Sequence, residues 1–591
     1  MSPRPVVYSI REEPSLIDGL SSHIKDETDN AEAKVLLSYP VVYIHYWPGK
    51  AIEYADNMGI TVSKKRFNVY VGESNDIIAR TKEHYLAGVD SSNWQSNLVN
   101  NRFISQLIVI GHPHFNKSFT LDIENKLIDY IAPGNNIENL FNARGNPQNG
   151  YYPVEEFDEV FHSVWRKLRR LNSELFLSLT EIEKTAFFKA SPLKKLTEDQ
   201  LNVKEEILAR VYDALENEKE GQLVFVQGEA GTGKTVLNSA LFYELVTKGE
   251  ELFGHRINCH LMVNHDQQLN VYQQIAKRLN LGKDLIHKPT SFINKYTEEN
   301  KVDVAFIDEG HLLLTQGKQS YTGHNQLDDI MRRSRVTVVM FDEYQVLTAE
   351  EYWEPDILTR FKELSYSQHN QLFLSQQLRM QCSDTTLNWI NSIVEFRTLL
   401  HFEKDPKYDV RSFDSPKELQ DAIRKRVKTD SLSRIVATYD WPFNIEQPPV
   451  DGEYWSVKIG DWSLPWNYQL DRELTRKEKR DNQSKAWAEQ DHTINEVGST
   501  FTIQGFDLSY VGVILGPSVK YLNNEIVFDP SESYNNKAKQ KRTLSDGSRR
   551  SFGETFIRNE VKVLLTRGVK GLYIYACDGA LRNALKTIAG V

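Results

Sequence analysis

The chain has 591 residues, and its 71 lysines and arginines against 81 aspartates and glutamates give a formal net charge of -10. Its 40% hydrophobic and 11% aromatic residues are typical of a soluble globular protein. At roughly 100 to 200 residues per domain, this length predicts about three or four compact units and excludes a single small domain. The acidic total argues against indiscriminate coating of nucleic acid but allows a local basic groove.

The first residues, MSPRPVVYSIREEPSL, lack a charged segment followed by an apolar run, and no stretch approaches the roughly 18 apolar residues of a membrane span. We therefore expect a cytoplasmic protein that makes no membrane contact. The three cysteines, Cys259, Cys382 and Cys577, lack CxxC spacing, which argues against a disulfide framework and a cysteine zinc site. Any metal must then be held by oxygen or histidine.

The N-terminal quarter of the chain predicts one small domain between two less regular segments. Residues 1–38 are polar without a clear period, and we expect a loosely ordered lead-in. Residues 39–150 predict a mixed α/β domain, because short β-type runs alternate with helical patterns. Its expected strands and helices are strands 41–46, 67–72 and 103–111 and helices 75–86 and 120–132. Residues 151–195 show apolar residues at helical spacing and predict a helical linker.

From Leu196 onward, buried-type strands alternate with helices, a pattern typical of parallel sheets. The expected strands are 222–227, 257–263, 303–308, 336–342, 434–439, 511–516 and 571–576. They form two blocks, which predicts two doubly wound domains, at 196–348 and 349–591, with a cleft between them. Ligands in such sheets bind at the carboxyl ends of the strands.

A phosphate-binding motif follows the first of these strands. Gly228, Gly231, Gly233, Lys234 and Thr235 match GxxxxGK[ST], and a helical pattern begins at once. The glycines let backbone N–H groups surround a polyphosphate, the lysine reaches the outer phosphates and the threonine hydroxyl can bind Mg²⁺. A chance glycine-rich turn is disfavoured by the strand and helix on either side. The motif therefore predicts bound ATP with Mg²⁺.

Acidic and amide side chains end two later strands. Asp308 is expected to hold Mg²⁺ through water, and Glu309 to orient or deprotonate the attacking water. Gln345, just after strand 336–342, is a candidate sensor of the γ-phosphate. Each of these side chains could alternatively belong to a polar turn after a buried strand. For Gln345, taken by itself, the polar turn is the better interpretation.

This order of motifs resembles the superfamily 1 helicases, in particular the Schlafen-type helicase domain found in many bacterial proteins. Gln200, in LTEDQ, looks like the glutamine that recognises adenine, and Arg379, in QQLR, like the arginine of the fourth motif. Residues 504–507 resemble the fifth motif, and Arg567, in LLTRG, lies in the sixth. The resemblance implies two RecA-like domains that close on ATP, bring both arginines to the γ-phosphate and step along a nucleic-acid strand. Alone, either arginine would more often be a surface ion pair.

A second set of residues, in the N-terminal domain, resembles the GIY-YIG nucleases. In order they are Tyr43, Tyr70, Arg80, His84, Glu124 and Asn142. VVY stands where GIY is usual and YVG where YIG is usual, so the tyrosines are kept while the first glycine is replaced by Val41. Taken singly, each residue also has a purely structural explanation: the tyrosines as half-buried strand aromatics, His84 as a packed histidine and Glu124 as a solvated carboxylate.

The resemblance implies hydrolysis of a phosphodiester with a single metal ion. It makes Glu124 the ligand of Mg²⁺ or Mn²⁺, and Tyr43 the group that helps deprotonate the water, a role that His84 could share. Tyr70 would position the water or the phosphate, and Arg80 would stabilise the pentavalent oxyanion. A free tyrosine titrates near 10, so Tyr43 needs the metal or Arg80 nearby at neutral pH.

Together the two resemblances predict an ATP-dependent helicase or translocase joined to a metal-dependent endonuclease. The expected partner is nucleic acid, DNA rather than RNA, and a homo-oligomer or a partner protein of a defence system is possible. Defence against phage or other foreign DNA is the role that analogy suggests. The alternatives are an ATP-driven clamp or a repair helicase whose N-terminal domain only binds.

Overall fold

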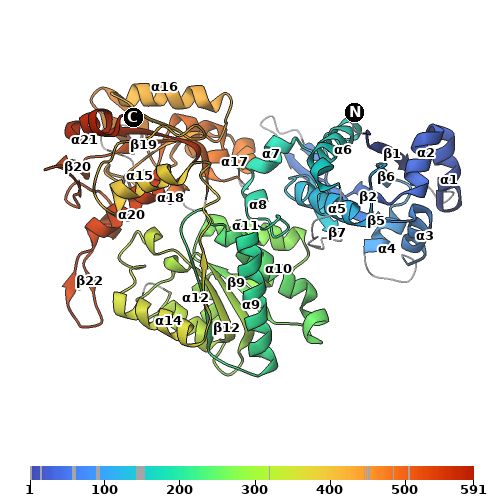
Figure 1. Ribbon diagram of the computed structural model, residues 1–591, viewed down its shortest axis with the longest axis horizontal. Coiled ribbons are helices and arrows are strands. Elements are labelled where there is room, and N and C mark those ends of the chain that lie inside the picture. The colour runs from blue at the N-terminus through green and yellow to red at the C-terminus, as the bar shows by residue number, and fades with distance from the viewer. Residues whose placement is uncertain are drawn as a thin grey trace. The chain divides into compact units, whose positions relative to one another are not determined.

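The computed structural model describes residues 3–12, 16–55, 61–87, 94–141, 153–317, 320–444, 446–447, 449, 453–482, 485–503 and 506–591. These form two compact units. The first contains residues 1–195 together with 271–284, and the second contains 196–270 together with 285–591. Figure 1 shows the ribbon of both.

The first unit is built on a five-stranded sheet in the order β1-β6-β2-β5-β7. Its strands are β1 (Val6–Arg11), β2 (Val41–Pro48), β5 (Phe67–Ser74), β6 (Gln106–Gly111) and β7 (Ile137–Phe141). β7 runs parallel to β5, and the other neighbours are antiparallel. The central strand β2 is buried on both faces from Val41 to His45, which is why its sequence reads as an unbroken β-type run.

Helices cover this sheet, and N-terminal capping side chains explain where two of them begin. They are α1 (Leu16–Glu27), α2 (Asn30–Ser38), α3 (Ile77–Ala87), α4 (Trp94–Asn100) and α5 (Lys117–Ile131). Asp29 caps α2 and Asn116 caps α5, each accepting hydrogen bonds from backbone N–H groups of the first turn. Between β2 and β5 lies a short antiparallel pair, β3 (Ile52–Ala55) and β4 (Thr61–Lys64).

The prediction of a loosely ordered lead-in at residues 1–38 is wrong. β1 pairs with β6 along its whole length, and Leu20, Ile24 and Leu36 of the two following helices are buried. β1 is an edge strand in which Tyr8 alone is fully buried, so it lacks the alternation that marks a strand in sequence.

The segment predicted as a helical linker at 151–195 is helical but belongs to the first compact unit. It contains η1 (Val154–Glu156), α6 (Phe157–Leu171), α7 (Leu179–Lys184) and α8 (Ala186–Lys189). α6 buries one face at helical spacing, formed by Val160, Phe161, Val164, Trp165 and Leu168.

The second unit contains two parallel sheets, as predicted. The first has the order β10-β9-β11-β12-β8-β13, and every pair in it is parallel. Its strands are β8 (Gln222–Gly228), β9 (Cys259–Val263), β10 (Ile286–His287), β11 (Val302–Asp308), β12 (Ser334–Phe341) and β13 (Gln371–Leu374). The main helices are α9 (Glu198–Glu216), α10 (Lys234–Phe253), α12 (Pro289–Lys295), α13 (Gln326–Arg332) and α14 (Pro355–Ser367). α11 (Asp266–Arg278) begins in this unit, and its residues from 271 onward are counted with the first unit.

The predicted boundary between 348 and 349 falls too early. β13 pairs in parallel with β8, so the first sheet extends to Leu374, and α14 packs against β8. β13 is a four-residue edge strand, too short to stand out as a buried run in the sequence.

The second parallel sheet has the order β14-β24-β19-β15-β18. Its strands are β14 (Asp409–Ser412), β15 (Arg434–Ala437), β18 (Val497–Gly498), β19 (Leu508–Leu515) and β24 (Gly568–Ala576). The helices include α15 (Asp384–Val394), α16 (Pro416–Val427), α18 (Thr500–Ile503), α20 (Gly553–Leu565) and α21 (Gly579–Ala584). Two parallel sheets with helices between strands are the expected architecture of two RecA-like domains.

Short hairpins are inserted in the second half. They are β16 (Ser456–Ile459) with β17 (Trp462–Pro465), β20 (Val519–Leu522) with β21 (Glu525–Phe528), and β22 (Arg542–Thr543) with β23 (Arg549–Arg550). Arg542 is 3% exposed and donates to Thr315 Oγ1 and to the Ala349 carbonyl, so this basic residue holds the hairpin against the first RecA-like domain.

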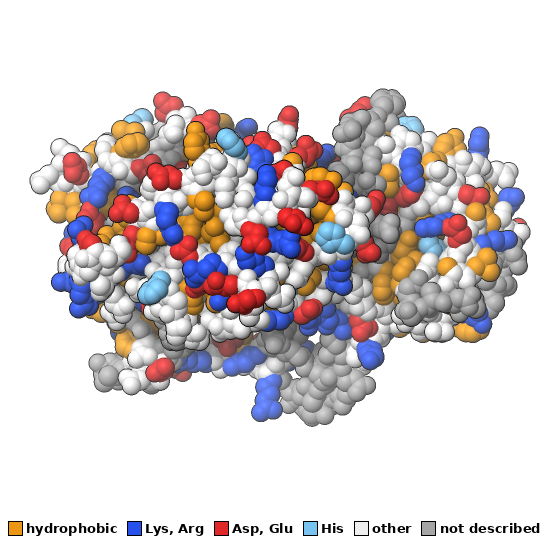
Figure 2. All heavy atoms as spheres, turned by 90° about the horizontal axis from the view of Figure 1, so that it is seen from below, with side chains coloured by type: hydrophobic (Ala, Val, Ile, Leu, Met, Phe, Trp, Pro, Cys, Tyr) orange, Lys and Arg blue, Asp and Glu red, His pale blue; other side chains and the backbone are white. Residues whose placement is uncertain are grey.

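The visible surface carries mixed charge. On the face in Figure 2, basic and acidic side chains alternate over short distances, and no broad field of one sign appears there. This agrees with the net charge of -10, which does not favour binding of nucleic acid over the whole surface. Throughout the part of the chain that the structure describes, each helix is too short or too polar to cross a bilayer.

Candidate active sites

The phosphate-binding motif forms a loop between β8 and α10. Gly231 (φ +92°) and Gly233 (φ +81°) take the left-handed conformation that side chains disfavour. There is also no room for one, because a Cβ at Gly231 would lie 2.6 Å from the Cβ of Arg379, and one at Gly233 would lie 2.1 Å from Nε2 of Gln200. The glycines therefore serve both the turn and the close approach of other elements.

Lys234, the first residue of α10, points back into this loop. Its Nζ donates to the carbonyls of Gly228 (2.6 Å) and Glu229 (2.9 Å) and lies 3.4 Å from Oδ2 of Asp342. The ammonium is thus fixed at the loop's mouth, where phosphate oxygens bind in such loops. Burial raises the pKa of Asp342, but Lys234 and other neighbours outweigh it, so the net shift is downward and the carboxylate is charged.

The predicted magnesium ligands lie together. Gln268, on α11, donates through Nε2 to Oδ2 of Asp308 and, at 3.4 Å, to Oγ1 of Thr235. One amide therefore joins the hydroxyl at the start of α10 to the carboxylate at the end of β11, which is 1% exposed. A hydroxyl and a carboxylate at this spacing fit the oxygen donors that Mg²⁺ prefers.

Glu309, directly after Asp308, has a left-handed backbone (φ +51°) and is 8% exposed. Its Oε2 lies 3.5 Å from Nε2 of His311. Burial lowers the pKa of His311, so the imidazole next to this carboxylate is neutral. A strained backbone at a buried acid is a feature of functional sites.

A chain of polar side chains joins the two RecA-like domains. Asp342 accepts from Gln345 Nε2 (2.8 Å), and Gln345 Oε1 accepts from Arg567 Nη2 (3.2 Å). Arg567 is fully buried, and burial together with nearby Arg379 lowers its pKa to about 9. It remains charged at neutral pH, and the path from Lys234 to Arg567 is continuous.

Arg379 and Gln200 also contact the loop. Arg379 forms an ion pair with Asp507, with Nε 2.5 Å from Oδ1. Gln200 is buried; its Oε1 accepts from the Thr197 N–H (3.0 Å) and its Nε2 donates to the Thr232 carbonyl (3.0 Å). Both ends of this amide already serve the fold, and adenine recognition by Gln200 stays a prediction. Residues 504–505 of the fifth motif lie outside the described residues.

A cavity of about 750 Å³ opens beside the loop, lined by Gly228, Glu229, Tyr344, Asn388 and Lys562 among others. Lys562, on α20, bonds Glu395 Oε1 at 2.6 Å and lies 3.5 Å from the ring centre of Tyr344. The sequence analysis missed Lys562, Asp342 and Gln268. Their signal was weak, because a single charged or amide side chain in a helix or turn is common.

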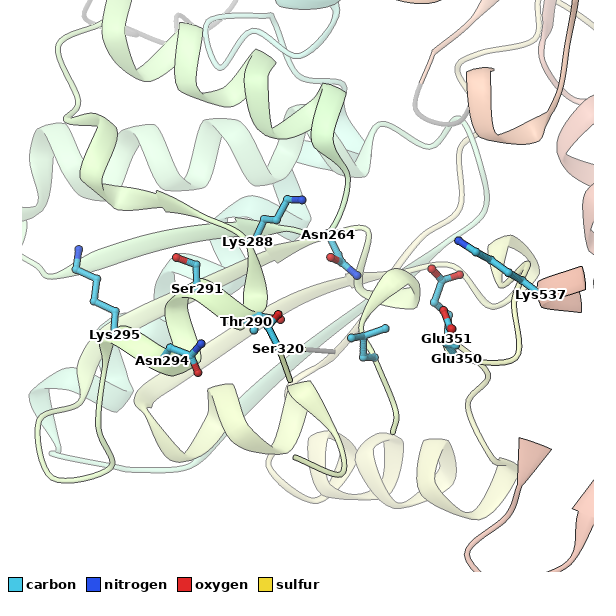
Figure 3. Close-up of a pocket in the computed structure, with 11 residues that line it drawn as sticks. Asn264, Lys288, Thr290, Ser291, Asn294, Lys295, Ser320, Glu350, Glu351 and Lys537 are labelled. Atoms are coloured by element: carbon cyan, nitrogen blue, oxygen red, sulfur yellow. The ribbon is translucent and has the colours of Figure 1, made fainter. Parts of the chain in front are cut away.

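A second cavity, of about 630 Å³, is lined by residues of the first RecA-like domain and by Lys537. Figure 3 shows Lys288 and Lys295 with Asn264 on one side, and Glu350, Glu351 and Lys537 on the other. Lys288 pairs with Asp266 at 2.5 Å. The lining is strongly polar and carries both signs of charge.

In the first unit, the predicted nuclease residues converge. Tyr43 Oη lies 2.7 Å from Nε2 of His84, and Arg80 Nε donates to the same oxygen at 3.3 Å. Arg80 and His84 are one turn apart on α3, which faces β2. Tyr43 is fully buried, and its rotamer is therefore fixed.

Tyr70, on β5, completes this face of the sheet. Its ring stacks on Trp94 with centroids 3.8 Å apart, and lies 6.0 Å from the ring of Tyr43. Gly72, paired with Tyr43 across the ladder, allows both rings to approach, because a Cβ there would lie 2.5 Å from Tyr43 Oη. Trp94 was not singled out from the sequence.

Glu124, on α5, is 8% exposed and acts on Tyr70, whose pKa is raised by burial and, to a smaller degree, by this carboxylate. The part of the chain that the structure describes contains no cluster of three or more His, Cys, Asp or Glu suited to a metal. One carboxylate ligand completed by waters suits Mg²⁺, which keeps several waters in its sites. Asn142 lies outside the described residues.

Protonation in this cluster is set mainly by burial. Burial, with Tyr70, raises the pKa of Tyr43, and Arg80 opposes that rise. Burial, with His45 and Arg80, lowers the pKa of His84 to about 3. At neutral pH the Tyr43 hydroxyl therefore donates to a neutral imidazole, and Arg80 supplies the positive charge.

Comparison with known proteins gives a family match and more distant likenesses. The family described as "Schlafen group 3, DNA/RNA helicase domain" matches residues 221–578, more than half of the chain and both parallel sheets. An uncharacterized protein of Saccharomyces cerevisiae, YPL245W, is 30% identical over 424 residues, which cover 66% of this chain and 90% of that protein. Among solved structures, Pif1 helicase from Candida albicans is 13% identical, with 64% of this chain and 95% of that chain covered and a TM-score of 0.26. The PRRSV helicase is 10% identical, with 63% and 54% covered and a TM-score of 0.25.

Proposed function

Because this chain belongs to the Schlafen group 3 helicase family, we propose that it is an ATP-driven nucleic-acid motor, and that its N-terminal unit is a GIY-YIG-type nuclease that cuts the strand. The motor would consist of the two RecA-like domains. The nuclease would use Mg²⁺ or Mn²⁺. DNA is the substrate that we expect.

The polar chain from Lys234 through Asp342 and Gln345 to Arg567 supports the motor. It begins at the loop that would hold the β- and γ-phosphates and ends on an arginine from the other RecA-like domain. Loss of the γ-phosphate would remove an anion from between Lys234 and Arg567, two buried cations. The gap between the domains would then widen, which is how a hydrolysis cycle drives stepping.

Asp308, Thr235 and Gln268 support the magnesium site of the motor. Mg²⁺ bound there would neutralise the phosphate charge. Glu309, next to Asp308, would orient the attacking water through its carboxylate. Arg567 and Arg379 would stabilise the negative charge that develops on the transferred phosphoryl group.

One observation carries the nuclease proposal: Tyr43, Tyr70, Arg80 and His84 come from three different elements and lie together, and Glu124, from a fourth element, is near enough to Tyr70 to raise its pKa. Side chains that served only as strand or helix surface would have no reason to meet. Glu124 would hold the metal ion, which supplies positive charge and an acidic water when bound.

The remaining residues would prepare the attack. His84 accepts the Tyr43 proton and so turns a lone pair of Tyr43 Oη toward the water. Arg80 favours the phenolate form of Tyr43 through its Nε–H. Its Nη1 pairs with Glu83 Oε2 at 2.6 Å, and a phosphate would have to compete with this partly exposed ion pair for the guanidinium. Water would attack phosphorus as it gives a proton to Tyr43 Oη, while Tyr43 passes its own proton to His84 Nε2. The ester P–O bond then breaks, and the leaving oxygen takes a proton from solvent.

A motor and a cutter on one chain suit the destruction of invading DNA, so we include defence against phage or other foreign DNA in the proposal. The analogy with bacterial proteins of this type is its support. A second copy or a defence-system partner would be compatible with it. The lysines Lys288 and Lys295 of the polar cavity would contribute to binding the phosphates of a strand.

The full burial of Tyr43 favours a second candidate, an ATP-driven clamp or repair helicase whose N-terminal unit only binds. The two are separated by paired variants of the intact protein. Lys234→Ala should abolish ATP hydrolysis under either function, measured as phosphate release with single-stranded DNA. Glu124→Gln should abolish strand cutting while ATP hydrolysis stays at the wild-type rate. Cutting that survives Glu124→Gln rejects the site, and a wild type that never cuts favours the clamp.

A further inference from the structure

A buried glutamate and a buried histidine lie next to the nuclease cluster. Glu12, just after β1, and His45, on β2, are both fully buried, and His45 Nδ1 lies 2.6 Å from Glu12 Oε1. Tyr85, on α3, donates to the other oxygen of Glu12. Three elements thus meet on one carboxylate.

His45 occupies the same face as the nuclease residues. It follows Tyr43 by two positions on β2, so both side chains point to one side of the sheet, and it pairs with Tyr70 across the ladder. Its ring lies 5.4 Å from Tyr43 at 80° and 5.8 Å from His84 at 89°, which are edge-to-face contacts. It therefore touches both partners of the 2.7 Å Tyr43–His84 hydrogen bond.

The polarity of this pair is not needed for packing. An aliphatic residue at position 45 would fill this fully buried strand position equally well, and no buried carboxylate would then be needed beside it. Removing a carboxylate from water has a large free-energy cost. Glu12 also fixes the ring: a carboxylate accepts from Nδ1–H, which leaves Nε2 as an acceptor. His45 Nε2 is buried and has no hydrogen-bond partner among the described residues.

Resting on the nuclease proposed above, we propose that Glu12 and His45 are positioning residues of that site. Glu12 holds the orientation and tautomer of His45. The His45 ring holds His84 and Tyr43 in the geometry that joins them, and its Nε2 offers an acceptor to the cluster. The segment before β2, through Glu12, thereby forms part of the proposed active site.

Cutting of labelled DNA by the intact protein with Mn²⁺ tests this. We expect His45→Leu, which keeps the volume, to lower kcat by about 10–100-fold with KM within about threefold, the size usual for supporting residues. His45→Gln, whose amide approaches the Nε2 position, should recover part of kcat, and Glu12→Gln should lie between wild type and His45→Leu. ATP hydrolysis, which belongs to the other unit, should not change.

His112 provides the matched control, because it is a fully buried histidine of the same unit that contacts the Pro3 carbonyl outside this cluster. His112→Leu should cut with the wild-type kcat. The proposal is overturned if His45→Leu also does so, or if it changes KM alone. Failure of the nuclease itself looks different: the wild type would not cut under any condition.

Discussion

Gly72 is the position at which the nuclease geometry can be disturbed by a single methyl group. In Gly72→Ala the new Cβ would lie 2.5 Å from Tyr43 Oη, 2.6 Å from its Cζ and 2.9 Å from Cε1 of Tyr70. Ordinary contact begins at about 3.4 Å, so Tyr43 Oη and Cβ must separate by about 0.9 Å. Both rings are buried and cannot swing into solvent.

A shift of that size would stretch or break the 2.7 Å bond to His84. We expect the cutting rate to fall about 100-fold, as for misplacements near 1 Å, and the free energy of unfolding of the unit to fall by about 1–3 kcal/mol. Cutting of a fluorescent oligonucleotide measures the first and urea titration the second. Gly19→Ala, whose Cβ meets only His23 at 3.4 Å, is the control. A Gly72→Ala protein that cuts at the wild-type rate would refute the predicted role of Tyr43.

Three further outcomes are expected. Arg567→Lys should slow ATP hydrolysis about 1,000-fold or more at unchanged ATP binding, since a lysine cannot bond Gln345 and the Phe506 carbonyl with two separate arms as Arg567 does. Equal rates in a phosphate-release assay would exclude a finger role. Gln268→Leu should raise the Mg²⁺ concentration for half-maximal hydrolysis about 10–100-fold, and an unchanged Mg²⁺ titration would count against its role. Because the folded pKa of His84 is about 3, below its usual 6.5, the unfolded chain binds more protons between these values. The unfolding free energy of the first unit should then decrease as pH falls from 6.5 toward 3, and His84→Gln should flatten that slope in urea titrations.

Much of the fold follows from sequence patterns that have a direct physical cause. The central strands of the two parallel sheets are buried on both faces, so they read as apolar runs, and every strand expected from such a run is present. Edge elements were missed for the opposite reason. β1 and β13 bury few side chains or are very short, and pairing with distant strands, not local pattern, makes them strands.

The site was predictable to the extent that each residue lies in a recognisable motif. Lys234, Asp308 and Tyr43 were found in this way. Asp342 and Gln268 were not, because their positions depend on strand order, which brings residues far apart in the sequence to one edge. The position of Glu12 was the hardest to predict, since this residue directly follows β1, which is a strand because it pairs with the distant β6.

The central claim is that both sites of this chain are chemically active. The direct test incubates the intact protein with Mg²⁺ or Mn²⁺, with and without ATP, and with single-stranded and duplex DNA and RNA, and follows phosphate release and strand products in the same samples. We expect phosphate release that nucleic acid stimulates, together with DNA products that vanish in Glu124→Gln. Phosphate release without any cut strand, in every combination, would contradict the claim.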